Sequence, residues 1–371
     1  SSSNSQKALV PELRFPEFRD DLKQSKLSDI SVYKTKRATD VKSHYVSTEN
    51  LLQNCMGIVP YTDKTAIDGI SFSINDILLG NIRPYLKKAW LAEFDGVCST
   101  DVLVLHPLKI EPSYFKYLIC RDKFFTYAMS SAKGSKMPRG DKAFIMDMTI
   151  SLPSINEQKK LASMLMLIDT LISKQEKLVD ELKLYKRGVI STLNCTALEC
   201  HEIAVGNVFS ITRGNVLATG NISPIKTEKF CYPVYSSQTK NDGLLGYYSD
   251  YLYEDAITWT TDGANAGYTK FRKGKFYCTN VCGVLINNDG YANNYVAELI
   301  NSISKKYVSY VGNPKLMNNV MAEVKINLPN IENQEFFSRT ISLIDSKISK
   351  ECSILNSLLM TKNALLQKMF I

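Results

Sequence analysis

The sequence lacks the features that would indicate a membrane, a secretory route or an oxidising compartment. No apolar run reaches the roughly eighteen residues that a membrane-spanning helix needs, and the opening stretch SSSNSQKALV contains no hydrophobic segment of a signal peptide. The nine cysteines are an odd number in a long chain, which does not indicate a disulfide framework. We therefore expect a protein of the reducing cytoplasm with no membrane contact.

Motifs of catalysis and metal binding are missing as well. The chain has no GxxxxGK-Ser/Thr loop and no HExxH helix, and it lacks the Asp/Asn-Pro-Pro-aromatic tetrad of an amino-methyltransferase. Cys195, Cys200 and His201 form one short cluster, and Cys278 and Cys282 have no second pair at zinc-site spacing. Buried thiols explain these cysteines better. We expect no catalytic residue and no metal site in this chain.

The charge balance restricts how the chain could meet nucleic acid. The 371 residues include 45 basic and 37 acidic side chains, for a net charge of +8. This excess permits nucleic-acid binding without requiring it. No region forms a polybasic tail, so any such contact must come from folded surfaces. The length indicates more than one domain.

One long segment, in contrast, is present twice. SLPSINEQKKLASMLMLIDTLISK (Ser151–Lys174) and NLPNIENQEFFSRTISLIDSKISK (Asn327–Lys350) share Leu-Pro, Ile, Gln, Leu-Ile-Asp and Ile-Ser-Lys in one ungapped register, 176 residues apart. In each copy a β-like stretch ends at the proline, and a residue that favours the helix N-cap, Ser154 or Asn330, follows it. A helix is therefore predicted to begin directly after each proline.

The apolar pattern of these helices indicates how they pack. Steps of four and three residues from Leu161, and again from Phe337, meet apolar side chains at eight of ten positions. A sustained repeat of 3.5 residues is typical of a coiled-coil seam, although each helix alone also fits an amphipathic helix packed on its own domain. About forty residues of helix would be about 60 Å long, which suits a spacer.

The two polar interruptions of each stripe suggest a register. They are Gln175 and Lys186 in the first helix and Glu351 and Lys362 in the second. For an antiparallel pair we favour the register that sets Lys186 against Glu351 and Gln175 against Lys362, since it pairs opposite charges. The alternative sets Gln175 near Glu351 and leaves the lysines apart.

The segments between the helices are also related. LSDISVYKTKRATD from Leu27 matches IAVGNVFSITRGN from Ile203 at nearly the same offset. Short β-branched and aromatic runs broken by turn residues are followed by one helix, from Glu111 in the first segment and from Tyr291 in the second. The fold class is thus mixed α/β (α+β), repeated twice. The predicted boundaries are 1–153 and 195–329 for two globular domains, and 154–194 and 330–371 for two long helices.

The chain resembles a known family of proteins. NDILLGNIRPYLKKAWLAEFDG, YPVYSSQTKNDGLLGYY and DGANAGYTKF are similar to target-recognition domains of the DNA-specificity subunits of Type I restriction-modification systems, and LRFPEF is similar to their N-terminal lead-in. The doubled architecture is the specific part of the resemblance, which covers essentially the whole chain. The second repeat departs from the family at Asn333, where an acidic residue is usual.

The resemblance implies a function and a set of partners. Each globular domain would read one half of a split, asymmetric DNA target, and the antiparallel helices would hold the domains apart and dock two methyltransferase subunits, which restriction subunits then join. This chain would hold no cofactor, since S-adenosylmethionine, ATP and Mg would belong to the partners. The candidate residues of the docking and spacer helices are Glu157, Gln158, Asp169, Gln334 and Asp345.

Candidate DNA contacts are cations and amides in segments with turn residues, because phosphate contacts position a protein and base edges specify it. The first domain supplies Lys34, Lys36, Arg37, His44, Arg83, Lys87, Lys133, Lys136 and Arg139. The second supplies Arg213, Asn241, Asn265, Lys270, Arg272 and Lys273. A solvated surface is the ordinary explanation of any one such cluster.

Two other classes of protein remain open at this point. A metal-dependent nuclease would need clustered carboxylates, and the Glu-x-Lys pairs at Glu181 and Glu323 have no well-placed strand aspartate before them. A coiled-coil scaffold that binds only proteins would explain the helices, but it leaves two large domains with basic loops unexplained.

Overall fold

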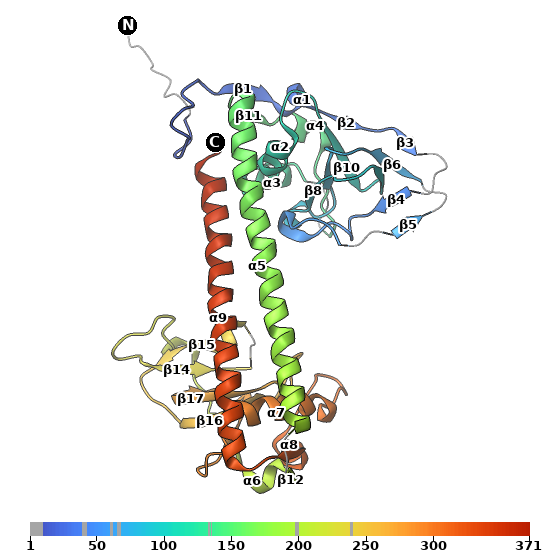
Figure 1. Cartoon of the computed structure of the whole chain (residues 1–371). Coiled ribbons are helices and arrows are strands. Elements are labelled where there is room, and N and C mark those ends of the chain that lie inside the picture. Colours follow the sequence, from blue (N-terminus) through green and yellow to red (C-terminus); the bar gives the residue numbers. More distant parts are fainter. Residues whose placement is uncertain are drawn as a thin grey trace. The chain divides into compact units, whose positions relative to one another are not determined.

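The computed structural model describes residues 10–38, 43–59, 62–64, 68–132, 134, 136–196, 200–237 and 240–371. They divide into two compact units, one reaching from the N-terminal side to Gln175 and including Ile354–Ile371, the other formed by Glu176–Ser353. Each unit holds one globular domain and a part of each long helix, α5 (Ile155–Thr196) and α9 (Ile331–Lys368) (Figure 1). Within the described ranges, no helix combines the length and apolarity needed to cross a bilayer.

The described residues of the first unit form three sheets. A two-stranded antiparallel sheet joins β1 (Lys23–Lys26) to β11 (Thr149–Leu152). The second has the order β2 (Ser31–Lys34), β10 (Val102–Pro107), β7 (Ile77–Gly80), β8 (Ala89–Leu91). The third has the order β3 (Arg37–Ala38), β6 (Gly69–Phe72), β9 (Gly96–Cys98), β4 (Ser43–Val46), β5 (Thr62–Lys64). Only β4 and β9 among these neighbours run parallel.

The helices of this domain are short. They are α1 (Leu27–Ile30), α2 (Pro112–Ile119), α3 (Asp122–Ser130) and α4 (Lys142–Met146). The single helix expected from Glu111 is two helices, because Arg121 has an extended backbone between them and is buried. Glu111 caps α2 by accepting a hydrogen bond from the Tyr114 N–H at 2.6 Å.

The second unit repeats this plan with a larger sheet. β12 (His201–Ala204) pairs with β19 (Lys325–Leu328) as β1 pairs with β11. The six-stranded sheet has the order β13 (Ser210–Arg213), β18 (Cys282–Ile286), β16 (Tyr253–Thr260), β17 (Thr269–Cys278), β14 (Tyr232–Tyr235), β15 (Leu244–Tyr248). The helices are α6 (Val205–Val208), α7 (Asn294–Ser304) and α8 (Asn318–Glu323). The mixed α/β class predicted for both domains is confirmed.

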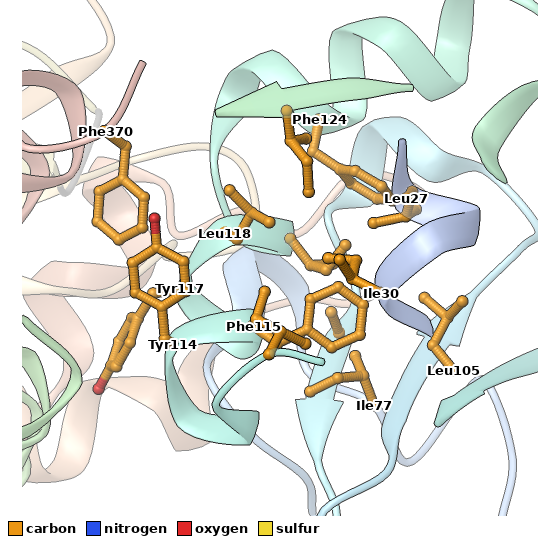
Figure 2. Close-up of a cluster of buried hydrophobic side chains, with 14 of the residues drawn as sticks. Leu27, Ile30, Ile77, Leu105, Tyr114, Phe115, Tyr117, Leu118, Phe124 and Phe370 are labelled. Atoms are coloured by element: carbon orange, nitrogen blue, oxygen red, sulfur yellow. The ribbon is translucent and has the colours of Figure 1, made fainter. Parts of the chain in front are cut away.

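The core of the first unit lies where α2 and α3 meet the four-stranded sheet. Phe115, Leu118 and Phe124 are buried in one cluster with Leu27 and Ile30 of α1, and Figure 2 shows these side chains together. The same cluster takes in apolar side chains from the first turns of α5 and from Met369 and Phe370. Burying each large side chain contributes roughly 1.5–3 kcal/mol, so the long helices are part of the domain core.

The residues that follow α9 contact α2 and Arg121. The Phe370 ring stacks on Tyr114 with a centroid distance of 5.0 Å and an interplanar angle of 18° (Figure 2). Arg121 donates a hydrogen bond to the carbonyl oxygen of Ile371 at 3.0 Å, and its guanidinium lies over the Phe370 ring. The segment that follows α9 therefore has a defined place in the first unit.

Both long helices begin as the sequence predicts. The backbone N–H of Glu157 donates to Ser154 Oγ at 3.4 Å, and that of Asn333 donates to Asn330 Oδ1 at 3.0 Å. These bonds satisfy donors of the first turn that have no partner inside the helix. The predicted helix starts after Pro153 and Pro329 are thus confirmed.

The two helices run antiparallel in each unit. In the first unit, Leu161 and Leu165 of α5 share a buried cluster with Met369, while Leu365 packs against it. In the second unit, Ile190 of α5 shares a cluster with Phe337 and Ile341 of α9. The start of one helix thus meets the end of the other in both units, as a coiled-coil seam of this polarity requires.

The favoured register of the polar interruptions is wrong. Lys186 Nζ lies 2.8 Å from Asp345 Oδ1, and Lys362 Nζ lies 2.7 Å from Asp169 Oδ1. Glu351 instead pairs with Lys347 on its own helix at 2.5 Å. The helices are thus set so that each lysine meets the aspartate of the opposite Leu-Ile-Asp motif.

Candidate nucleic-acid interface

Two loops of the first unit, far apart in the sequence, form one surface. The turn between β7 and β8 (81–88) lies against residues 136–140, where Ile82 forms a β-bridge with Arg139. The Arg83 N–H donates to the Pro138 carbonyl oxygen at 2.8 Å. The candidate DNA contacts Arg83 and Lys87 therefore lie on one loop, and Lys136 and Arg139 lie on the loop that it contacts. We call residues 81–88 and 136–140 the paired loops of the first unit.

The second unit builds the same pair from different residues. The turn between β16 and β17 (261–268) lies against residues 309–315, where Asp262 forms a β-bridge with Lys315. The Gly263 N–H donates to the Pro314 carbonyl oxygen at 2.9 Å. We call 261–268 and 309–315 the paired loops of the second unit. The two domains thus share the backbone contacts of the paired loops but carry different side chains on them.

The cations of the first paired loops differ in how they are held. Arg83 and Lys136 are exposed. Arg139 donates to Asp101 at 2.8 Å and stays 59% exposed, while Lys87 Nζ lies 2.5 Å from Asp122. Lys133, another candidate DNA contact of the first domain, lies outside the described residues.

Among the candidates Lys34, Lys36, Arg37 and His44, the structure leaves Lys36 and Arg37 exposed. Lys34 Nζ lies 2.6 Å from a carboxylate oxygen of the fully buried Asp76, which also lies 2.7 Å from His106 Nδ1. Lys36 is exposed, and Arg37 makes a loose ion pair with the exposed Asp68 at 3.6 Å. The His44 ring lies edge-on to Phe94. Lys34 is therefore held at the sheet by a buried carboxylate, which His106 shares.

The cluster on β17 separates into buried and exposed residues. The Arg272 guanidinium is buried, lies 3.8 Å from the centroid of the Tyr235 ring and donates to Thr258 Oγ1 at 3.1 Å. Burial raises the pKa of Tyr235, and the charge of Arg272 opposes this rise. Lys270 pairs with Asp242, and Lys273 is exposed. Arg272 therefore packs inside the domain, which corrects its expected place on a binding surface.

The remaining candidates of the second domain lie in different surroundings. Arg213 donates to Asn318 Oδ1 at 3.0 Å and is half-buried at the end of β13. Asn265 is exposed within the second paired loops. Asn241 belongs to a short 3-10 turn, Lys240–Gly243, and its side chain lies outside the description. Base or phosphate contact by these residues stays a prediction.

Gln158 and Gln334, expected at a docking surface, are buried instead. Gln158 donates from Nε2 to the Pro153 carbonyl oxygen at 2.9 Å, and its Oε1 accepts from the Glu111 N–H at 3.0 Å. Gln334 donates to the Pro329 carbonyl oxygen at 2.7 Å, and its Oε1 accepts from Asn293 Nδ2 at 3.3 Å. Glu111 and Asn293 are the N-cap residues of α2 and α7. Each glutamine thus joins a long helix to the main helix of its domain.

Glu157 is buried by the N-terminal lead-in. Arg14 donates from Nε and Nη2 to both carboxylate oxygens of Glu157, each at 2.8 Å. The hydrogen bond to Glu157 raises the pKa of the Arg14 guanidinium, and burial opposes it. Such a bidentate pair has fixed geometry. The uncharged Asn333 holds this position in the second repeat, so the same ion pair cannot form there.

Asp169 and Asp345 each face a lysine from the opposite long helix. Asp169 also accepts from the Tyr117 hydroxyl at 2.8 Å and lies 3.3 Å from Lys116 Nζ. Burial alone would raise the pKa of Asp169, but the hydrogen bond and charge of Lys362, with Lys116 and Tyr117, hold it below its ordinary value. Sequence reasoning missed Lys116 because nothing in its own segment marks it.

In the corresponding cluster of the second unit, the residue from the domain helix carries the opposite charge. Lys186 contacts Glu298 of α7 as well as Asp345. Burial disfavours the charged lysine, but the carboxylates of Glu298 and Asp345 outweigh this and raise the pKa of Lys186. Lys116 and Glu298 stand five residues after the N-caps of α2 and α7. The same helix position therefore carries a cation in one domain and an anion in the other.

The glutamates of the two Glu-x-Lys pairs and the two cysteines at 278 and 282 lie on separate elements of the second unit. In the described part of the chain, no group of three or more histidine, cysteine, aspartate or glutamate side chains gathers at metal-binding distance. Glu181 makes an exposed ion pair with Lys177 at 3.8 Å, and Glu323 is exposed on α8. Cys278 and Cys282 are buried free thiols, and burial raises the pKa of Cys282 to about 11.

Comparison with known proteins agrees with the doubled design. The family model described as "Type I restriction modification DNA specificity domain" matches residues 20–184 and again residues 199–359. The chain therefore belongs to the specificity subunits of Type I restriction-modification systems, a family whose role is DNA recognition. The resemblance on which this was predicted is confirmed.

Individual relatives cover parts of the chain. A protein named as the N-terminus of a type I specificity subunit of Mycoplasma pneumoniae is 37% identical over 134 residues, 35% of this chain and 70% of the relative. The Type I restriction enzyme MpnII specificity subunit of the same organism is 36% identical over 134 residues, 35% of this chain and 39% of that subunit. The crystal structure of an S subunit from M. genitalium has a TM-score of 0.69 at 16% identity, covering 98% of this chain and 99% of that one. This last likeness shows the fold.

Proposed function

We propose that the two domains of this chain read the two halves of a bipartite, asymmetric DNA target for a Type I restriction-modification complex. The observation that carries the proposal is the repetition of the paired loops, with one backbone frame and different side chains in the two units. A similar reader present twice suits a target of two half-sites, and different side chains suit half-sites of different sequence. The long helices would set the unread spacer between them.

The long helices also support a proposal for partners. Exposed apolar side chains recur at equivalent places of α5 and α9: Leu167 with Leu343, Leu178 with Ile354, and Leu184 with Met360, between 37% and 73% exposed. Recurring exposed apolar residues on a soluble protein mark interaction surfaces. Since the set occurs once in each unit, it supports docking of two copies of one partner, the methyltransferase subunit, which restriction subunits join.

In this proposal the chain catalyses nothing. Methyl transfer from S-adenosylmethionine would take place on the methyltransferase subunits, and ATP and Mg would serve the restriction subunits. The specificity chain would supply DNA contacts, spacing and docking surfaces. Free protein with S-adenosylmethionine and DNA should therefore transfer no methyl group, and turnover by the free chain would contradict this part of the proposal.

The test is to express the chain with its neighbouring methyltransferase and sequence the methylated sites of the host. We expect one interrupted sequence with two different halves, absent when either gene is omitted. A continuous site, or methylation without this chain, would contradict the proposal.

A paired variant tests the docking surface separately. Leu167→Asp combined with Leu343→Asp should abolish methylation while DNA binding by the purified chain persists. Leu108→Asp, at an exposed apolar residue outside the long helices, is the matched control. Equal methylation by the double variant and the control would contradict docking at these residues.

A further inference from the structure

Arg83 has a backbone conformation for which the other domain uses glycine. Arg83 and Lys87 have φ angles of 53° and 51°, and the corresponding residues of the second paired loops, Gly263 and Gly267, have φ angles of 94° and 85°. Side chains other than glycine are strained in this left-handed region. The first domain therefore retains two cations at a conformational cost that the second domain avoids.

The hydrogen bonds show that these positions correspond. The Leu86 N–H donates to the Arg83 carbonyl oxygen as the Ala266 N–H donates to that of Gly263, both at 2.9 Å. Both Arg83 and Gly263 donate their own N–H to the proline of the facing loop, Pro138 or Pro314. The turn thus demands a left-handed residue, whatever its side chain.

A structural reason accounts for Lys87 but not for Arg83. Lys87 Nζ lies 2.5 Å from Asp122 at the start of α3, which fastens the turn to the helix. Arg83 is exposed, and among the described residues its guanidinium has no hydrogen bond or ion pair. Strained residues that the fold does not need are concentrated at functional sites.

The surroundings of Arg83 point to an anion. Arg139 lies across the β-bridge beside it, and Lys136 is a third exposed cation of the paired loops. At the corresponding positions the second domain has Gly263, Lys315 and Gly312. Exposed cations gathered on two contacting loops suit the oxygens of a phosphate, which Arg can bind through two parallel bonds.

We propose that Arg83 contacts a backbone phosphate of the first half-site, and that the second domain has no equivalent contact. This inference rests on the proposed function. Binding of the first half-site then includes a phosphate contact that binding of the second lacks. The affinity for the first half-site therefore depends more steeply on the salt concentration. Because a phosphate contact carries no base information, Arg83 fixes the position of the first domain on the duplex without selecting its sequence.

The test is the variant Arg83→Gly in the full-length chain. Glycine suits the backbone, so the melting temperature should stay the same or rise. Binding to duplex carrying the methylated site should weaken, and the slope of log Kobs against log salt should become shallower by about 0.9, the value for one phosphate contact. Arg83→Lys should keep most of the slope, and Lys109→Gly, an exposed cation outside the paired loops, should leave it unchanged.

Three results would overturn the inference. They are an unchanged salt slope, a loss of affinity confined to duplexes with one particular base pair, and a drop of several degrees in the melting temperature of Arg83→Gly. The second would make Arg83 a base reader, and the third would give it a structural role. Wild-type protein that does not bind the duplex at all would contradict the proposed function itself, before any variant is compared.

Discussion

Lys186 and Asp345 form an ion pair of 2.8 Å between the two long helices, and the second unit thereby repeats the 2.7 Å pair that Lys362 makes with Asp169 in the first. Each pair takes its carboxylate from a Leu-Ile-Asp motif. In each unit a charged residue of the main domain helix joins the pair, Glu298 in one and Lys116 in the other. The repeated motif thus fixes a domain to two helices at once.

Removing Lys186 should destabilise the second unit. Lys186→Met leaves Glu298 and Asp345 facing each other without a cation, and uncompensated charges that are partly buried are costly. We expect a loss of about 1–3 kcal/mol in the free energy of unfolding, measured by urea denaturation. Lys177→Met removes an exposed partner on the same helix and should change stability by less than about 0.5 kcal/mol. Equal effects of the two variants would contradict the role given to Lys186.

The Asp169 cluster predicts an acid sensitivity. The pKa of Asp169 in the folded protein lies below its ordinary value of 3.8, so the unfolded state binds the proton more readily. Its contribution to stability is therefore complete above about pH 4 to 5 and is lost as the pH falls through 3.8 and below. Asp169→Asn should flatten the fall in stability over that acid range, measured as melting temperature against pH. Asp180→Asn, an exposed control, should keep the wild-type profile.

The buried glutamines should be sensitive to the loss of their amides. Gln158→Leu keeps the approximate volume but leaves the Pro153 carbonyl and the Glu111 N–H without a partner. Unsatisfied buried groups cost about 1–3 kcal/mol each, so the two groups together predict a loss of about 2–6 kcal/mol, and a similar loss for Gln334→Leu. Gln367→Leu, on an exposed part of α9, is the control. A stability scan that ranks Gln367→Leu with the other two would refute this reading of the repeated glutamine.

Spacer length should follow the length of both long helices together. Four residues inserted between Gln175 and Glu176, with four more between Ser353 and Ile354, extend α5 and α9 at the boundary of the two units and leave both ion-pair clusters intact. The addition is about 6 Å of helix, close to two base pairs of rise, and about one turn. The methylated site should keep both halves and gain spacer. An unchanged spacer would mean that the helices do not set the distance.

The sequence predicted those features that depend on local residues. Pro153 with Ser154 was sufficient to place the start of a helix, because capping and the restriction before proline act within a few residues. The register of the two long helices was not predictable, because Lys186 pairs with Glu298 of α7 as well as with Asp345 of α9. Arg272 was misplaced because the cluster of cations on β17 gave no sign that its guanidinium would lie over Tyr235, a residue distant in the sequence.

The paired loops also have one feature that local residues predicted and one that they could not predict. Both contributing segments of the first unit were chosen for their cations, but their contact depends on a β-bridge between Ile82 and Arg139 that no local pattern indicates. The equivalence of Arg83 with Gly263 likewise becomes visible only through backbone angles and matching hydrogen bonds.

The most direct test of the central claim is a domain exchange read out by sequencing methylated sites. Residues 20–153 would be replaced by the corresponding domain of another Type I specificity subunit, keeping Arg14 and the long helices so that Glu157 retains Arg14 and Asp169 retains Lys362. One half of the methylated target should change, while the other half and the spacer stay the same. Changes in both halves, or in neither, would contradict the claim that each domain reads one half-site by itself.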